Sequence, residues 1–230
     1  KTEDEINIVK EAVTISEQAL QKTWNFIRIG MTELEVKAEL EYQMTMLGAD
    51  AIAFETIVLS GKRSALPHGS ANNSKIKAGD FLLFDFGVTK NGYHSDLTRT
   101  CIVGHATKEQ EQIYQTVKRA NELAIASVQA GEALQVIDQT ARNYITEQGY
   151  GDFFTHRIGH GLGLDVHEYP SIHESNTEKI KPGLLFTIEP GIYVPDIGGV
   201  RIEDDIYVQE DGTIEVLSSF TKDLIQIGNE

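Results

Sequence analysis

Apolar residues recur at three- and four-residue steps in two long segments of the chain, at residues 4–29 and 107–129. This periodicity is typical of an amphipathic helix. Thr32 followed by Glu35 has the spacing of a capping box, which indicates the start of a further helix. We expect four helices in all, at residues 4–29, 32–48, 107–129 and 133–148.

Shorter apolar runs between these segments predict β-strands. The run over residues 80–88 is nearly all apolar, which favours a central position in a sheet. Residues 92–103 follow it closely and should pair with it as a hairpin. Further strands are expected at residues 51–59, 184–194, 201–209 and 213–218. No low-complexity linker interrupts these elements, so residues 1–230 are interpreted as one compact α/β domain.

The chain contains an internal repeat. KIKAGDFLLFDFG starts at Lys75 and KIKPGLLFTIEPG starts at Lys179, 104 residues later. This offset aligns Asp85 with Glu189, and a predicted helix pair precedes each copy. A duplicated helix-helix-strand-strand unit would face itself across a pseudo-twofold and direct the two carboxylates to one central point.

The composition argues against several classes of function. Asp and Glu total 35 against 20 Lys and Arg, a formal net charge of −15, and no cluster of basic residues suggests nucleic-acid binding. The single cysteine, Cys101, excludes an intrachain disulfide. No apolar run approaches the ~18–20 residues of a membrane span, and the charged start lacks a signal-peptide core. We therefore expect a cytoplasmic protein that binds neither nucleic acid nor membranes. Since the chain starts without Met, it is expected to be processed or a fragment.

Four acidic residues lie in apolar sequence surroundings: Asp85, Asp96, Glu189 and Glu203. A carboxylate in such a place is costly unless a cation or hydrogen bonds satisfy it. One such residue would be weak evidence, but two of these four are related by the repeat. The four residues together therefore indicate a metal site.

Histidines can complete such a site. His156, His160 and His167 fall within the segment HRIGHGLGLDVHE, and His68 lies in another loop. The His-Glu-x-x-His pattern of zinc proteases does not occur. Four carboxylates and an imidazole suit manganese, with cobalt or zinc as substitutes. Four negative charges favour two divalent ions over one.

Five segments, taken together, resemble the Xaa-Pro peptidases, which are the proline dipeptidases and aminopeptidase P enzymes. The segments occur in the family's order and span nearly the whole chain: ALPHG from Ala65, FDFGVTKNGYHSDLTRT from Phe84, HRIGHGLGLDVHE from His156, TIEPGIY from Thr187 and GGVRIEDDIYV from Gly198. The resemblance implies an α/β (α+β) pita-bread fold, in which duplicated units surround a curved antiparallel sheet and a central dinuclear metal site.

The resemblance also implies a ligand set. Asp85 would bind one metal, Asp96 and Glu203 would bridge both, and His160 and Glu189 would complete the other site. A water shared by the ions would attack the peptide bond before proline as hydroxide. Glu189 would act as general base and then as general acid.

Further residues match the family's substrate positions. His68 and His167 would stabilise the oxyanion or the leaving proline nitrogen, and His156 would bind substrate. Arg201 would hold one of the bridging carboxylates in place. Xaa-Pro peptides are thus the expected partners, and a homodimer is possible in the full-length protein.

Alternatives remain at this point. Many relatives carry an N-terminal creatinase-like domain, which this chain lacks. Methionine aminopeptidases share the five ligands, but not the Arg-Ile-Glu-Asp-Asp context that starts at Arg201. Non-catalytic binding modules with this fold usually lose ligands. The sequence leaves open whether dipeptides or longer peptides are preferred and which metal is native.

Overall fold

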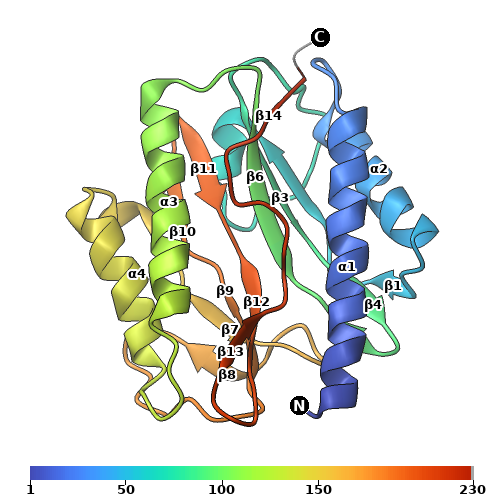
Figure 1. Ribbon diagram of the computed structural model, residues 1–230. Coiled ribbons are helices and arrows are strands. Elements are labelled where there is room, and N and C mark those ends of the chain that lie inside the picture. Colours follow the sequence, from blue (N-terminus) through green and yellow to red (C-terminus); the bar gives the residue numbers. More distant parts are fainter. Residues whose placement is uncertain (229–230) are drawn as a thin grey trace.

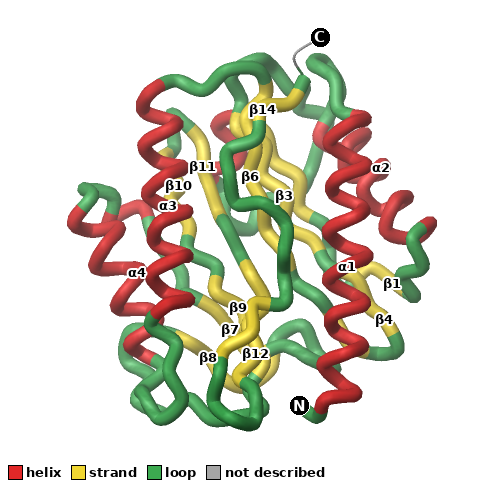
Figure 2. Tube along the Cα trace, in the orientation of Figure 1, coloured by secondary structure: helices red, strands yellow, loops and turns green. Residues whose placement is uncertain are grey.

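The structure is a computed structural model of the 230-residue chain and describes residues 1–228. In Figures 1 and 2, helices α1 and α2 flank the strands on one side, and α3 and α4 flank them on the other. Among residues 1–228, no helix is long and apolar enough to cross a membrane. The helices span Glu3–Phe26 (α1), Glu33–Met46 (α2), Lys108–Ala126 (α3) and Gln135–Glu147 (α4).

All four predicted helices are present within a few residues of the expected ends. Thr2, Thr32 and Thr107 each form a capping box, in which the threonine side chain accepts a hydrogen bond from a first-turn N–H. The apolar faces of α1 and α2 share one hydrophobic cluster with strand residues, and those of α3 and α4 share a second. Each helix pair therefore covers its own half of the sheet structure.

The first half contains six strands, two of which form the predicted hairpin. Strand β3 pairs antiparallel with β6, and Asp85 lies opposite Thr98. The predicted strand over 80–88 is wrong in one respect, because it is broken at Gly87. A Cβ atom at this glycine would lie 1.9 Å from the carbonyl oxygen of Ser95, so no side chain fits there. The strands span Ala51–Ile52 (β1), Ile57–Ser60 (β2), Phe81–Phe86 (β3), Val88–Lys90 (β4), Tyr93–His94 (β5) and Leu97–Val103 (β6).

The second half contains a five-stranded sheet in the order β13-β12-β9-β7-β8 and a separate β10-β11 pair. The last strand, β14, pairs in parallel with β6 of the first half. The strands span Gly159–Gly161 (β7), Glu168–Ile172 (β8), Leu185–Ile188 (β9), Gly191–Val194 (β10), Gly198–Arg201 (β11), Asp204–Val208 (β12), Ile214–Val216 (β13) and Gln226–Ile227 (β14). Two short 3-10 helices, η1 (Gly61–Ala65) and η2 (Gly151–Phe153), complete the fold.

Several predicted strands are interrupted. The strand expected over 51–59 is divided into β1 and β2, and the one over 184–194 is divided into β9 and β10. The strand expected over 201–209 begins only at Asp204. Strands β7, β8, β11 and β14 are additional, and the glycines of β7 and β11 hide their apolar alternation.

The repeat is also present in three dimensions. The N–H of Gly30 donates to the carbonyl of Ile76, and the N–H of Gly131 donates to the carbonyl of Ile180. The side-chain oxygens of Asn72 and Asn176 each accept a hydrogen bond from the backbone N–H two residues later. The same local contacts thus join the helix-pair loop to the strand-entry loop in both halves.

Candidate metal centre

The predicted site residues line a single cavity. It has a volume of about 490 Å³ and draws its walls from both repeats. All five predicted metal ligands line it, as do the four residues predicted to contact or support the substrate. The lining residues are Phe54, Ile57, His68, Asp85, Asp96, His156, Arg157, His160, Val166, His167, Glu189, Arg201 and Glu203.

The predicted ligands come from strand ends and breaks. Asp85 is the penultimate residue of β3, and Glu189 directly follows β9 at the equivalent position of the repeat. Asp96 precedes β6, Glu203 lies between β11 and β12, and His160 is the middle residue of β7. Three of the five predicted ligands, Asp96, Glu189 and Glu203, therefore lie at the interruptions that make the strands hard to predict.

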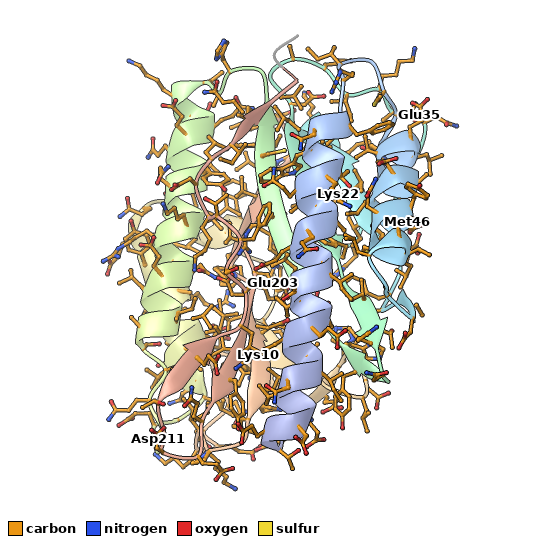
Figure 3. The ribbon with its side chains drawn as sticks, turned by 45° about the vertical axis from the view of Figure 1, so that its right-hand side comes forward. Lys10, Lys22, Glu35, Met46, Glu203 and Asp211 are labelled. Atoms are coloured by element: carbon orange, nitrogen blue, oxygen red, sulfur yellow. The ribbon has the colours of Figure 1, made fainter. Side chains whose placement is uncertain are left out.

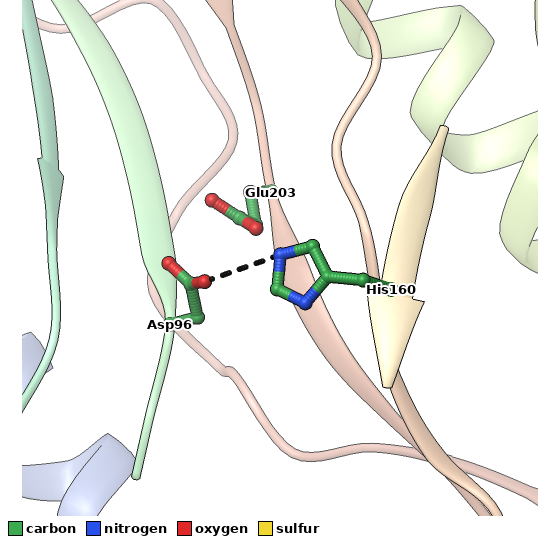
Figure 4. A group of neighbouring side chains, drawn as sticks. All are labelled: Asp96, His160 and Glu203. Carbon is green, nitrogen blue, oxygen red and sulfur yellow. Dashed lines mark ion pairs between the residues drawn. The ribbon is translucent and has the colours of Figure 1, made fainter. Parts of the chain in front are cut away.

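Three of the ligands form a tight group. One ligand atom from each of Asp96, His160 and Glu203 lies within 4.8 Å of the other two. Figure 4 shows these three side chains directed toward one another. These residues are 5%, 3% and 2% exposed, respectively. The Nε2 atom of His160 lies 3.6 Å from Asp96 Oδ2 and 3.6 Å from Glu189 Oε1. Figure 3 shows Glu203 in the interior, whereas the labelled Glu35 and Asp211 lie at the periphery.

The tautomer of His160 suits a metal ligand. Its Nδ1 atom lies 3.0 Å from the carbonyl oxygen of Gly161, and a carbonyl can only accept, so Nδ1 carries the proton. Burial lowers the pKa of His160 to about 4, which keeps the imidazole neutral near pH 7. The Nε2 lone pair therefore faces the carboxylates, a geometry typical of histidine ligands.

Three of the carboxylates lack sufficient charge compensation. Burial, and next the charge of Glu203, raises the pKa of both Asp96 and Glu189 well above the ordinary value. Burial, and next the charge of Asp85, raises the pKa of Glu203 to about 8. These three crowded carboxylates cannot all ionise without added positive charge. This donor set of oxygens and one neutral imidazole fits divalent cations.

Arg201 contacts one carboxylate directly and another through a threonine. Its Nη2 atom donates to Oδ2 of Asp85, a contact that was not among the predictions. Its Nε atom donates to Thr98 Oγ1 at 3.1 Å, and that hydroxyl donates to Glu203 Oε2 at 2.5 Å. The strand pairing explains this arrangement, since Asp85 and Thr98 lie opposite each other on β3 and β6.

Both ring nitrogens of His156 form hydrogen bonds within the protein. Its Nδ1 lies 2.8 Å from the carbonyl oxygen of Arg157, and its Nε2 lies 2.7 Å from the hydroxyl of Tyr193. That hydroxyl also accepts a hydrogen bond from Arg201 Nη1 at 2.8 Å. Burial, and next the charge of Arg201, lowers the pKa of His156 to about 3. Both ring nitrogens are therefore already occupied, although the ring lines the cavity.

The other two histidines face the cavity close to the ligands. The ring of His167 stacks edge-on against that of His160, with the centroids 4.2 Å apart. His68, from the loop after η1, also lines the cavity. Two imidazoles thus stand beside the group of carboxylates without belonging to it.

Four residues of the cavity wall were not predicted from the sequence. Phe54, Ile57 and Val166 provide an apolar surface, and Arg157 adds a second guanidinium. Arg157 directly follows His156 in a segment already singled out, so its position was the available signal. The apolar residues carry no such signal, because nothing in the sequence separates them from core residues.

Residues 7–210 match metallopeptidase family M24, and the chain belongs to this family. An Xaa-Pro dipeptidase of Pyrococcus furiosus is 44% identical over 212 residues, which cover 92% of this chain and 61% of the relative. The solved structure of an Xaa-Pro dipeptidase from Bacillus anthracis is 45% identical, with a TM-score of 0.96, and the match covers 99% of this chain and 64% of that one. An X-Pro aminopeptidase structure from Thermotoga maritima MSB8 is 42% identical, with a TM-score of 0.96 and coverage of 99% and 64%.

These likenesses confirm the predicted family and its α/β pita-bread fold. The chain spans less than two thirds of the length of the relatives it matches, 61% in the case of the Pyrococcus furiosus dipeptidase.

Proposed function

We propose that this chain is the catalytic unit of a metal-dependent Xaa-Pro dipeptidase, which hydrolyses the bond between an N-terminal residue and proline. The observation that carries the proposal is that nine residues chosen from sequence line one cavity of about 490 Å³. The printed functions of the dipeptidase relatives support the same substrate class.

Asp85, Asp96, His160, Glu189 and Glu203 would hold two divalent ions, whose four positive charges match the four carboxylates. Manganese fits this oxygen-rich set, and cobalt or zinc can replace it. When bound, such ions polarise a carbonyl group and lower the pKa of water.

Glu189 lies where it can move the reaction's proton. Its carboxylate lines the cavity, where it could accept a proton from the attacking water and return it to the proline nitrogen. That nitrogen carries no hydrogen in the peptide, so bond cleavage requires a proton donor. His68 and His167 stand beside the ligands, where they can donate hydrogen bonds to the developing oxyanion.

The apolar wall can accommodate the proline ring. Phe54, Ile57 and Val166 contribute hydrophobic surface next to the ligands. Contact with a rigid ring removes apolar area from water at little cost in ligand entropy. This wall would select proline by shape after the scissile bond.

The direct test is peptide hydrolysis by the metal-stripped chain, with and without added manganese. We expect manganese-dependent release of proline from Ala-Pro. Cleavage of Ala-Pro-Ala but not Ala-Pro would indicate an aminopeptidase P, and cleavage of Met-Ala-Ala alone would indicate a methionine aminopeptidase. Failure to cleave any of the three with metal bound would overturn the proposal.

A further inference from the structure

Arg157 is a cationic side chain in the cavity wall that the proposed reaction does not use. It lies in the loop between η2 and β7, three residues before His160. Its Nη1 atom donates to the hydroxyl of Ser171 on β8 at 2.9 Å. Among residues 1–228, no carboxylate lies within 4.0 Å of its guanidinium nitrogens. This distinguishes Arg157 from Arg201, which also lines the cavity.

The other arginine of the cavity already has a carboxylate partner. Arg201 is paired with Asp85, and both ring nitrogens of His156 already have hydrogen-bond partners within the protein. Asp96, Glu189 and Glu203 would hold the cations of the proposed function together with Asp85. Arg157 is then the guanidinium of the cavity wall that has no carboxylate partner in the described part of the chain, which points to an anionic group on the bound molecule.

We propose that Arg157 binds a carboxylate of the substrate and thereby sets which Xaa-Pro peptides are cleaved. The proposal rests on the function proposed above. A guanidinium presents a planar set of donors that matches a carboxylate bidentately. The hydrogen bond to Ser171 occupies Nη1 and fixes the plane, which leaves Nε and Nη2 free to donate.

Two substrate carboxylates could occupy this position. One is the free α-carboxylate of proline, which exists only in a dipeptide. The other is an acidic side chain on the residue before proline. The first would make Arg157 a selector of dipeptides over longer peptides, and the second would make it a selector of Glu-Pro and Asp-Pro sequences.

The test compares the metal-loaded wild-type chain with Arg157→Met on Ala-Pro, Ala-Pro amide and Glu-Pro amide. If the α-carboxylate is bound, kcat/KM for Ala-Pro should fall roughly 10- to 100-fold, mainly through KM, while both amides are unchanged. If the side chain is bound, only Glu-Pro amide should show this fall. An equal change for all three substrates, or none, would overturn the proposal.

Two variants control for structural effects. Arg119→Met removes an exposed guanidinium on α3, outside the cavity, and should leave all three substrates unaffected. Arg157→Lys keeps the charge without the planar donor set, and should recover part of the lost selectivity. A wild-type chain that cleaves none of these substrates would contradict the proposed function. Calorimetric binding of Ala-Pro, Ala-Pro amide and Glu-Pro amide to wild type and Arg157→Met would then still decide the role of Arg157.

Discussion

Two adjacent residues, Glu203 and Asp204, belong to buried charged clusters of opposite character. Glu203 faces the cavity, among carboxylates with too few cations. Asp204 accepts hydrogen bonds from Arg99 at 2.7 Å, from Lys222 at 2.9 Å and from Ser218 at 2.7 Å. Both acids are almost fully buried, at 2% and 0% exposure. Burial alone therefore cannot explain how differently they behave.

Their pKa values shift in opposite directions. Burial raises the pKa of Asp204, but Arg99 and Lys222 outweigh it, and the net pKa lies below the ordinary value. Burial and Asp85 raise the pKa of Glu203 to about 8. The Asp204 cluster is complete within the protein, whereas the cavity cluster needs charge from outside. A buried acid is thus informative about function when its cation is missing, not merely because it is buried.

The largest effect is expected from Glu189→Gln, which alters the incomplete cluster. The amide keeps the shape but removes a negative charge and the proton acceptor. We expect kcat on Ala-Pro to fall by roughly 100- to 10,000-fold. The melting temperature without metal should be unchanged or higher, because a repelling carboxylate is gone. Turnover at the wild-type rate would contradict the role of Glu189.

Removing a charge from the Asp204 cluster should destabilise the protein, unlike the Glu189→Gln change in the cavity. Arg99→Met leaves Asp204 without its main partner and removes hydrogen bonds to the carbonyl oxygens of Phe220 and Thr221. We expect the free energy of unfolding to fall by about 3–5 kcal/mol, measured by urea denaturation without metal. Glu203→Gln, as the matched change in the cavity, should cost little under the same conditions. Equal losses in the two variants would remove the distinction between the clusters.

A smaller effect concerns His156, at the edge of the cavity cluster. The folded protein lowers the pKa of His156 from 6.5 to about 3, so the unfolded chain binds more protons between these values. Stability should therefore fall as the pH drops below 6.5, by up to about 1.4 kcal/mol per pH unit. In metal-free protein, His156→Asn should lose less stability than wild type between pH 7 and 5.5. Parallel declines would show that this histidine is not held neutral.

Much of the fold could be predicted from the sequence because its signals are local. Helix periodicity and the Thr32–Glu35 capping box helped to locate the helices, and the repeat aligned Asp85 with Glu189, which lie at equivalent positions of β3 and β9. Strand limits were less predictable. The break at Gly87 depends on the carbonyl of Ser95 from the neighbouring chain segment, which only the folded structure supplies.

The same distinction between local signals and tertiary contacts applies to the candidate site. Carboxylates in apolar segments are conspicuous, so the predicted ligands could be chosen from the sequence, and the structure places all of them on one cavity. The partner of Arg201 could not, because it depends on the register that sets Asp85 opposite Thr98. Arg157 was missed for a similar reason: its lack of a carboxylate partner becomes visible only when the whole cavity is assembled.

The central claim is that the cavity cluster is completed by two divalent ions, and metal content tests it most directly. The chain would be stripped, equilibrated with manganese, dialysed and measured by elemental analysis, beside His160→Ala and the exposed control His105→Ala. The account predicts two ions per chain in wild type and control, and a clear loss of occupancy in His160→Ala. Wild-type protein without stoichiometric metal, or equal content in all three, would contradict it.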